Sequence, residues 1–159
     1  MKSKFVALIH GLFLLVLTPG CWLTGSDTYD VTKYTAAHQA ALDGDDAALA
    51  PLLKSNPHLI SVPDYDKNTL LHLAVMHDRT NTVSLLLDSK AEVDAKNSVG
   101  MTPLHLAARE GFFVVAKILV EHHADRKITD QRGWTALKWA EMSHHEDLAA
   151  LLRENGASN

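Results

Sequence analysis

The sequence predicts an all-α solenoid of about four helix-turn-helix units, because one short pattern returns at a fixed spacing along the chain. The segments that begin at Thr69, Thr102 and Thr135 read TLLHLA, TPLHLA and TALKWA, and the two intervals between them are equal. A related segment, TAAHQA, begins at Thr35, one position further from Thr69 than this interval. A repeat period of about 33 residues indicates stacked supersecondary units, each of which buries its apolar face only against its neighbours.

The start of each segment carries the signals of a helix N-terminus. Thr is a favoured N-cap residue, and Pro103 follows Thr102 at the first helical position, where its missing N–H costs nothing. A His three residues after the Thr can hydrogen-bond back to it, as in a capping box. We assign this structural role to Thr35, His38, Thr69, His72, Thr102, Pro103, His105 and Thr135.

A turn and a second helix follow in each unit. Nine residues after each motif Thr stand Gly44, Asp78, Gly111 and His144. Residues of these types tolerate positive φ, so they predict a turn between two helices. The apolar row that comes next in each unit predicts the second helix.

The period and the T-P-L-H-x-A pattern resemble the ankyrin repeat. The resemblance extends over residues 31–157, and it implies repeats at about 31–63, 64–96, 97–129 and 130–159, within a domain of residues 31–159. It also implies β-hairpin-like loops between the units and a non-catalytic role in binding another protein. Lys90 and His123 stand where the family usually has Gly, and a positive φ there would cost about 1 kcal/mol each.

The first twenty residues have the layout of a secretory signal. Lys2 and Lys4 form a basic start, and residues 5–17 are apolar apart from one His and one Gly. An apolar stretch of this length is too short to span a bilayer stably. The sequence therefore predicts that residues 1–20 are removed on export, and the other interpretation is a buried N-terminal helix.

The segment at residues 17–21 resembles a bacterial lipobox, which implies that Cys21 carries a lipid. Residues 21–30 would then be a short tether between the lipid and the domain. Ordinary cleavage after Gly20 or Gly25 would instead leave a soluble secreted domain. The sequence thus predicts a periplasmic protein, anchored to the inner or the outer membrane through the lipid on Cys21.

Composition excludes several other classes of protein. The single cysteine rules out an internal disulfide framework and a zinc site built on CxxC pairs. The formal net charge is −4, and removal of residues 1–20 would leave 13 Lys and Arg against 19 Asp and Glu. A nucleic-acid partner requires a basic surface, so we expect none.

The histidines and carboxylates do not form a recognisable catalytic or metal-binding motif. His122-His123 and His144-His145-Glu146 are adjacent residues, not the i, i+4 pair of a zinc-binding helix. The sequence has no G-x-S-x-G and no glycine-rich phosphate loop. We expect a non-enzyme with no cofactor and no metal site, and histidine-based metal binding is the remote alternative.

In ankyrin-type arrays the partner usually lies against the hairpin tips and the exposed side of the first helices. Counted from the motif Thr, the positions on that surface are Tyr34, Tyr65, Asp66, Met76, His77, Val99, Met101, Arg109, Glu110, Arg132, Trp134 and Met142. Aromatic residues, Met and Arg are enriched at protein interfaces. We expect these side chains to be exposed, with Trp134, Met101 and Tyr65 as anchors; the alternative is local packing against the hairpins.

The resemblance implies two uses for such a domain in a bacterial envelope. One is an immunity or antitoxin role, in which the domain binds and inhibits a secreted effector such as a phospholipase. The other is an accessory or scaffold role for a resident enzyme, such as a catalase that acts against oxidative stress. In both, the partner is another protein, and we expect the free protein to be monomeric.

Overall fold

The computed structural model describes residues 31–154 of the 159-residue chain, and side chains from residue 35 to residue 153. The predicted signal and the tether with Cys21 lie outside the described residues. Between residues 31 and 154 the chain forms eight α-helices and one 3₁₀ helix, and its β pairing is one isolated bridge between Thr129 and Thr135. None of these helices is long and apolar enough to cross a membrane.

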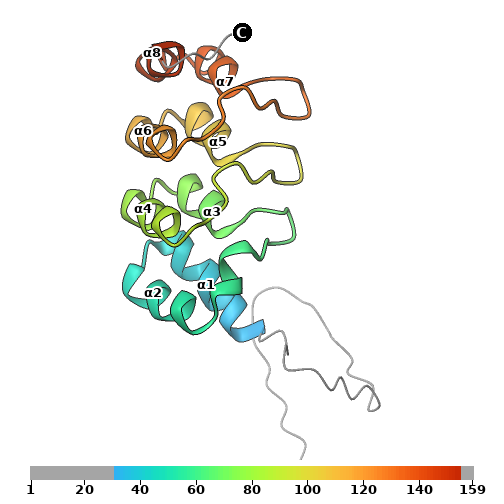
Figure 1. The fold of residues 1–159 in the computed structure, drawn as a ribbon. Coiled ribbons are helices and arrows are strands. Elements are labelled where there is room, and N and C mark those ends of the chain that lie inside the picture. Colours follow the sequence, from blue (N-terminus) through green and yellow to red (C-terminus); the bar gives the residue numbers. More distant parts are fainter. Residues whose placement is uncertain (1–30, 155–159) are drawn as a thin grey trace, which may run out of the picture.

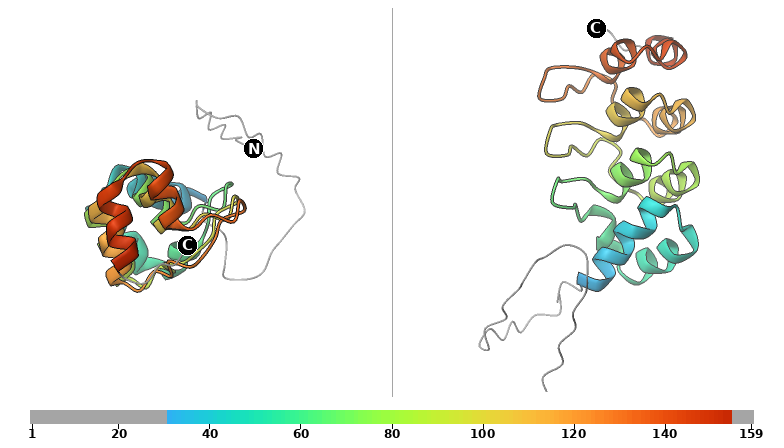
Figure 2. Two further views of the ribbon diagram at one scale, coloured as in Figure 1. Left: turned by 90° about the horizontal axis from the view of Figure 1, so that it is seen from above. Right: turned by 180° about the vertical axis from the view of Figure 1, so that it is seen from behind.

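The helices stack as four antiparallel pairs in two columns (Figures 1 and 2). They are α1 (Val31–Asp43), α2 (Asp46–Ser55), η1 (Pro57–Ser61), α3 (Leu70–Met76), α4 (Thr80–Asp88), α5 (Pro103–Glu110), α6 (Phe113–Glu121), α7 (Ala136–Met142) and α8 (Glu146–Glu154). The odd-numbered helices form one column and the even-numbered α-helices the other, while the loops before α3, α5 and α7 project to one side. The predicted all-α solenoid is confirmed.

The core lies between the two columns of helices. Ala74, Ala107 and Ala140 occupy equivalent places in α3, α5 and α7, and each is 0% exposed. Because Ala has almost no side chain, successive first helices can pack closely at these points. Leucines of the second helices, among them Leu86 and Leu119, fill the remaining volume and are also fully buried.

Two buried histidines connect successive units. At the start of α3, the backbone N–H of Thr69 donates to Nδ1 of His72 at 3.3 Å, and the Thr69 hydroxyl lies 3.0 Å from the same nitrogen. The opposite ring nitrogen, Nε2, lies 3.0 Å from the carbonyl oxygen of Met101 in the next unit. A carbonyl only accepts, so Nε2 carries the hydrogen and the ring is in one defined tautomer.

The same arrangement recurs one unit later. His105 closes the capping box with Thr102, and its Nε2 lies 3.0 Å from the carbonyl oxygen of Trp134. Burial lowers the pKa of both His72 and His105, against the opposing effect of these carbonyl hydrogen bonds. A proton on Nδ1 would face the Thr N–H donor, so the structure requires the neutral ring.

The first and last units depart from this pattern. Thr135 is the N-cap of α7 and accepts from the backbone N–H of Lys138 at 3.3 Å, but Lys138 replaces the capping His. The prediction that Thr35 caps a helix is wrong, because α1 begins at Val31 and Thr35 lies inside it. Residues 31–34 contain neither Gly nor Pro, so the helix runs through Thr35 without a break. His38 is nevertheless buried, at 8% exposed.

The predicted turns all have positive φ. The angle is 76° at Gly44, 53° at Asp78, 79° at Gly111 and 62° at His144. Lys90 and His123, which stand two residues after the ends of α4 and α6 in place of Gly, also have positive φ, at 70° and 65°. Each of the second helices α4 and α6 is therefore followed by a non-glycine residue in the left-handed backbone conformation.

We predict that Lys90→Gly raises the free energy of unfolding by about 0.5 to 1 kcal/mol, because Gly adopts this φ without steric strain. Urea denaturation measures the change. The control is Lys117→Gly, in the middle of α6, which should lower the free energy of unfolding by about 1 kcal/mol. A loss of stability in both variants would contradict the strain at Lys90.

The buried histidines predict a stability that falls in mild acid. Because their pKa values in the folded state lie below the unfolded value of 6.5, the unfolded chain binds more protons below that pH. The stabilisation is complete above pH 6.5 and is lost as the pH falls through the folded-state pKa. Urea denaturation between about pH 7.5 and pH 5 should show this slope. His105→Gln should flatten this slope, because it removes one of the two buried imidazoles.

Candidate protein-binding face

The three projecting loops share one turn design. Their tips are residues 64–67, 97–100 and 130–133. Each tip begins with an Asp or Asn whose side chain accepts a hydrogen bond from a backbone N–H four residues later. The pairs are Asn68 to Asp64 (2.7 Å), Met101 to Asn97 (3.0 Å) and Trp134 to Asp130 (3.0 Å). This local bond fixes the shape of each tip.

Hydrogen bonds also join each tip to the next. The N–H of Ser98 donates to the carbonyl of Asp66 at 2.8 Å, and the N–H of Gln131 donates to the carbonyl of Val99 at 3.2 Å. The side-chain amide of Gln131 adds a bond of 2.9 Å to the carbonyl of Ser98. The three tips therefore form one continuous edge whose backbone is held in place.

Four of the predicted binding residues stand on this edge. Tyr65 is 100% exposed and Val99 is 48% exposed. Asp66 and Arg132 are exposed as well. Because the backbone of these tips is already ordered, a partner can bind there with little cost in free energy for ordering the loops.

A second row of predicted residues lies at the C-terminal ends of the first helices. Met76 and Met142 are 40% and 52% exposed, and His77 is exposed too. In the third unit, Arg109 is half-buried and its Nε lies 2.8 Å from Oε1 of the exposed Glu110. This face thus has exposed methionines on the first helices of the second and fourth units, and the Arg109–Glu110 ion pair on the first helix of the third unit.

The prediction that Met101 is an exposed anchor is wrong. Met101 is only 3% exposed, because His72 holds its carbonyl and the loop turns its side chain inward. Nη1 of Arg109 lies 3.8 Å from the Met101 sulfur, so the arginine covers the methionine. A partner on this face would meet Arg109 in its place.

Trp134 is half-buried and packs locally, which was the alternative to an exposed anchor. Its ring lies 5.0 Å from that of Trp139 in an edge-to-face arrangement at 64°. The Arg132 guanidinium lies 5.6 Å from the Trp134 ring and 5.3 Å from the Trp139 ring, within cation–π range. Asp130 accepts from the Trp139 indole N–H at 2.9 Å.

Sequence reasoning missed Asp130 and Trp139. Burial alone would raise the pKa of Asp130, but hydrogen bonds from the backbone of Trp134 and Arg132 and from the Trp139 indole lower it below its usual value. The sequence does carry a signal for Trp139, because this Trp stands at the motif position that Leu73 and Leu106 occupy in the two preceding units. Of the other predicted residues, Tyr34 lies in α1 with its side chain outside the described part, and Cys21 lies outside it altogether.

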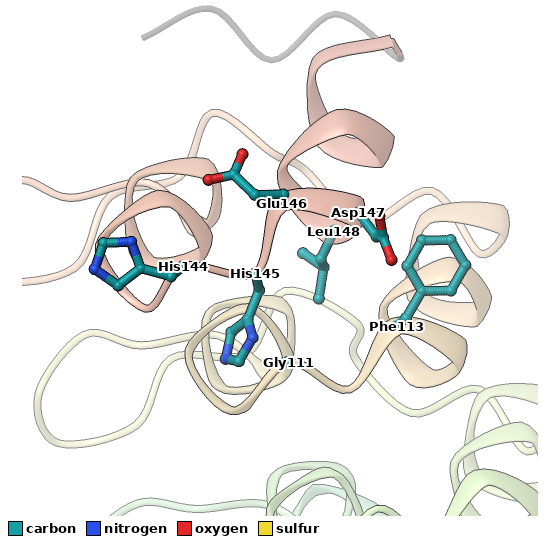
Figure 3. Close-up of a pocket in the computed structure, with 7 residues that line it drawn as sticks. All are labelled: Gly111, Phe113, His144, His145, Glu146, Asp147 and Leu148. Atoms are coloured by element: carbon teal, nitrogen blue, oxygen red, sulfur yellow. The ribbon is translucent and has the colours of Figure 1, made fainter.

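The histidines near the α7–α8 turn do not converge on one point. They line a pocket of about 330 Å³ with Gly111, Phe113, Glu146, Asp147 and Leu148 (Figure 3). His144 points away from the pocket centre, while Nε2 of His145 lies 3.1 Å from the carbonyl oxygen of Arg109. Within the described residues, no three His, Cys, Asp or Glu side chains are placed to hold a metal ion.

Comparison with known proteins identifies the repeats. A family model described as ankyrin repeats (3 copies) matches residues 7–97 and 91–159, which is nearly the whole chain. The chain belongs to the ankyrin-repeat family. Ankyrin repeats generally form non-enzymatic modules that bind other proteins, so the face of hairpin tips and first helices is the site to consider first.

Notch receptors are among the similar proteins. The chain is 36% identical over 130 residues to Neurogenic locus notch homolog protein 1 of Xenopus tropicalis and 35% identical to its human counterpart. It is 38% identical over 90 residues to Protein glp-1 of Caenorhabditis elegans. These matches span 81%, 81% and 57% of this chain but only 5%, 5% and 7% of those proteins. The similarity therefore concerns the ankyrin array alone.

We predict that Trp139→Phe lowers the free energy of unfolding by about 1 to 2 kcal/mol, because buried Asp130 loses a hydrogen bond while most of the ring area is kept. The pKa of Asp130, followed by NMR, should rise towards its usual value. Trp134→Phe is the matched control, because it leaves all of the Asp130 hydrogen bonds in place. Equal losses in the two variants would contradict the role of the indole N–H.

Proposed function

We propose that this ankyrin array is exported to the periplasm, where it binds and inhibits a protein partner. The partner would be a secreted effector enzyme such as a phospholipase, and the array its immunity or antitoxin protein. The observation that carries the proposal is the fixed edge of three hairpin tips, which presents a fully exposed Tyr65 and a half-exposed Val99 beside exposed Met76 and Met142. Fixed aromatic and apolar side chains in water are typical of a surface that a partner buries.

The charge distribution supports a basic partner. Residues 21–97 carry 6 Lys and Arg against 11 Asp and Glu, while residues 98–159 carry 7 against 8. On the binding face, the first tip presents the acidic Asp66 and the last tip presents Arg132. A basic surface on the partner would meet the N-terminal units more favourably, and this would mainly raise the association rate.

The export part of the proposal rests on the sequence. Residues 1–20 have the three-part layout of a signal, and Cys21 stands where a lipoprotein signal places its lipidated cysteine. A tether of residues 21–30 reaches about 35 Å when fully extended. A lipid on Cys21 would therefore hold the binding face close to the membrane that a phospholipase attacks.

An accessory or scaffold role is the second candidate. In this case the array would bind a resident envelope enzyme, such as a catalase, without inhibiting it. The exposed apolar residues Phe113 and Val114 on α6, away from the hairpin tips, favour this alternative, because a scaffold has more than one binding surface. The activity of the bound enzyme separates the two roles, since an immunity protein abolishes it and a scaffold preserves it.

Histidine-based metal binding is the remote alternative. The described residues offer no cluster for it, so any such site would need the segments outside them. A rise in melting temperature with added zinc would indicate a folded-state metal site.

We predict that Tyr65→Ala and Val99→Asp each weaken binding of the partner at least about tenfold, because each removes an exposed apolar contact from the face. The partner is identified by cross-linking in envelope extracts and purified, and its affinity is measured by isothermal titration calorimetry. Asp88→Asn, an exposed change at the end of α4, serves as the control. If both tip variants bind as tightly as the wild type while folded, the hairpin edge is not the binding face.

A further inference from the structure

The helix α6 begins with two exposed apolar residues where the other second helices are largely polar. Phe113 is 41% exposed and Val114 is 56% exposed. The equivalent pairs, one repeat before and one repeat after, are Thr80-Asn81 at the start of α4 and Glu146-Asp147 at the start of α8. Among these three helices, only α6 therefore presents a bulky apolar pair to solvent at its first turn.

The fold gives little reason for this pair. The N-cap of α6 is Phe112, which makes no side-chain hydrogen bond, whereas Asp45 caps α2 by accepting from the N–H of Ala48 at 3.0 Å. A polar residue in place of Phe112 would satisfy a free N–H group of the first turn of α6. Phe113 and Val114 instead leave a large part of their surface in water, so core packing does not require them.

Phe113 stands between two hollows on the seam between α6 and α8. One hollow, of about 330 Å³, lies towards the α7–α8 turn and includes Gly111, His145 and Asp147 (Figure 3). The other, of about 340 Å³, is lined by Phe113, Asp147, Ala150 and Leu151. Phe113 and Asp147 border both hollows, and the seam lies on the side of the stack away from the hairpin tips.

The charged side chains at the seam are acidic. Asp147 lines both hollows and Glu146 lines the one near the α7–α8 turn, and neither Lys nor Arg is among the described residues that line them. Both carboxylates are exposed and form no ion pair within residues 35–153. The N-terminus of α8 offsets only part of their charge, because its dipole amounts to roughly half a positive charge.

We propose that this seam, formed by Phe113, Glu146 and Asp147 and extended on α6 by the exposed neighbour Val114, is a second docking surface. Its occupant is a segment of a partner protein that carries a bulky apolar side chain next to Lys or Arg. The apolar side chain packs beside Phe113 in a hollow, and the cation pairs with Asp147 or Glu146. This proposal is independent of the hairpin-tip face, because the two surfaces share no residue.

The acidic border selects this occupant over two others. An anionic lipid surface would be repelled by Glu146 and Asp147. A second copy of the chain would bring the same acidic pair to a symmetric contact, and like charges placed opposite each other oppose association. Both are distinguishable outcomes of the experiment.

The test measures fluorescence anisotropy of labelled dodecapeptides with the full chain. The probe contains Leu, Lys, Gly and Ser; one companion has Glu for every Lys, and the other has Ser for every Leu. We expect the Leu/Lys peptide to bind at least about tenfold more tightly than either companion. Phe113→Ser should weaken its binding about tenfold, and Asp147→Asn about two- to fivefold.

Matched controls keep the result interpretable. Asp88→Asn removes an exposed carboxylate from α4 and should leave binding unchanged, and melting curves establish that every variant is folded. Val114→Ser provides a second, more exposed apolar change. Equal binding of the three peptides, or full binding by both Phe113→Ser and Val114→Ser, overturns the proposal.

Two further readouts identify a different occupant. A dimer seen by light scattering and lost in Phe113→Ser would assign the seam to a second copy. Binding to phosphatidylglycerol vesicles that is lost in the same variant would assign it to a membrane. Either result overturns the partner-segment proposal and leaves the hairpin-tip face untouched.

Discussion

The buried histidine bridge is the interaction on which the rest of this structure depends. His72 and His105 each close a capping box at the start of a first helix and reach a carbonyl oxygen of the following unit. One ring thus satisfies the helix N-terminus and fixes the loop that enters the next helix. Because the Met101 and Trp134 carbonyls are held in this way, the hairpin tips just before them have a fixed position relative to the core.

This bridge explains why one short loop carries both core and surface residues. Val99 and Met101 are separated by a single residue, and yet Val99 is half-exposed at the tip while Met101 is buried. The histidine fixes the Met101 backbone at the base of the loop, and Arg109 covers the side chain. The ladder of bonds between tips holds Tyr65 and Val99 outward. A surface suited to protein binding results from the way the units are joined.

In the last unit, other interactions take the place of the bridge. In this unit Lys138 occupies the position of the bridging histidine. Arg132, Trp134 and Trp139 pack on one another there, with Asp130 holding the indole. The seam at Phe113 lies one unit inward, where an apolar pair interrupts an otherwise polar outer surface.

The sequence by itself determined the repeat period, the helix pairs and the turns, because these depend on local signals. Thr-Pro at a helix start and residues that accept positive φ act within one unit. Exposure was decided only by the tertiary structure. The apolar side chains of Met101, Trp134 and Phe113 could each lie in the protein interior or at the surface. Which of the two they adopt depends on neighbours such as Arg109, Trp139 and Asp147. Those neighbours stand on the helices α5, α7 and α8, and they reach these side chains only when the loops fold back and the helices stack.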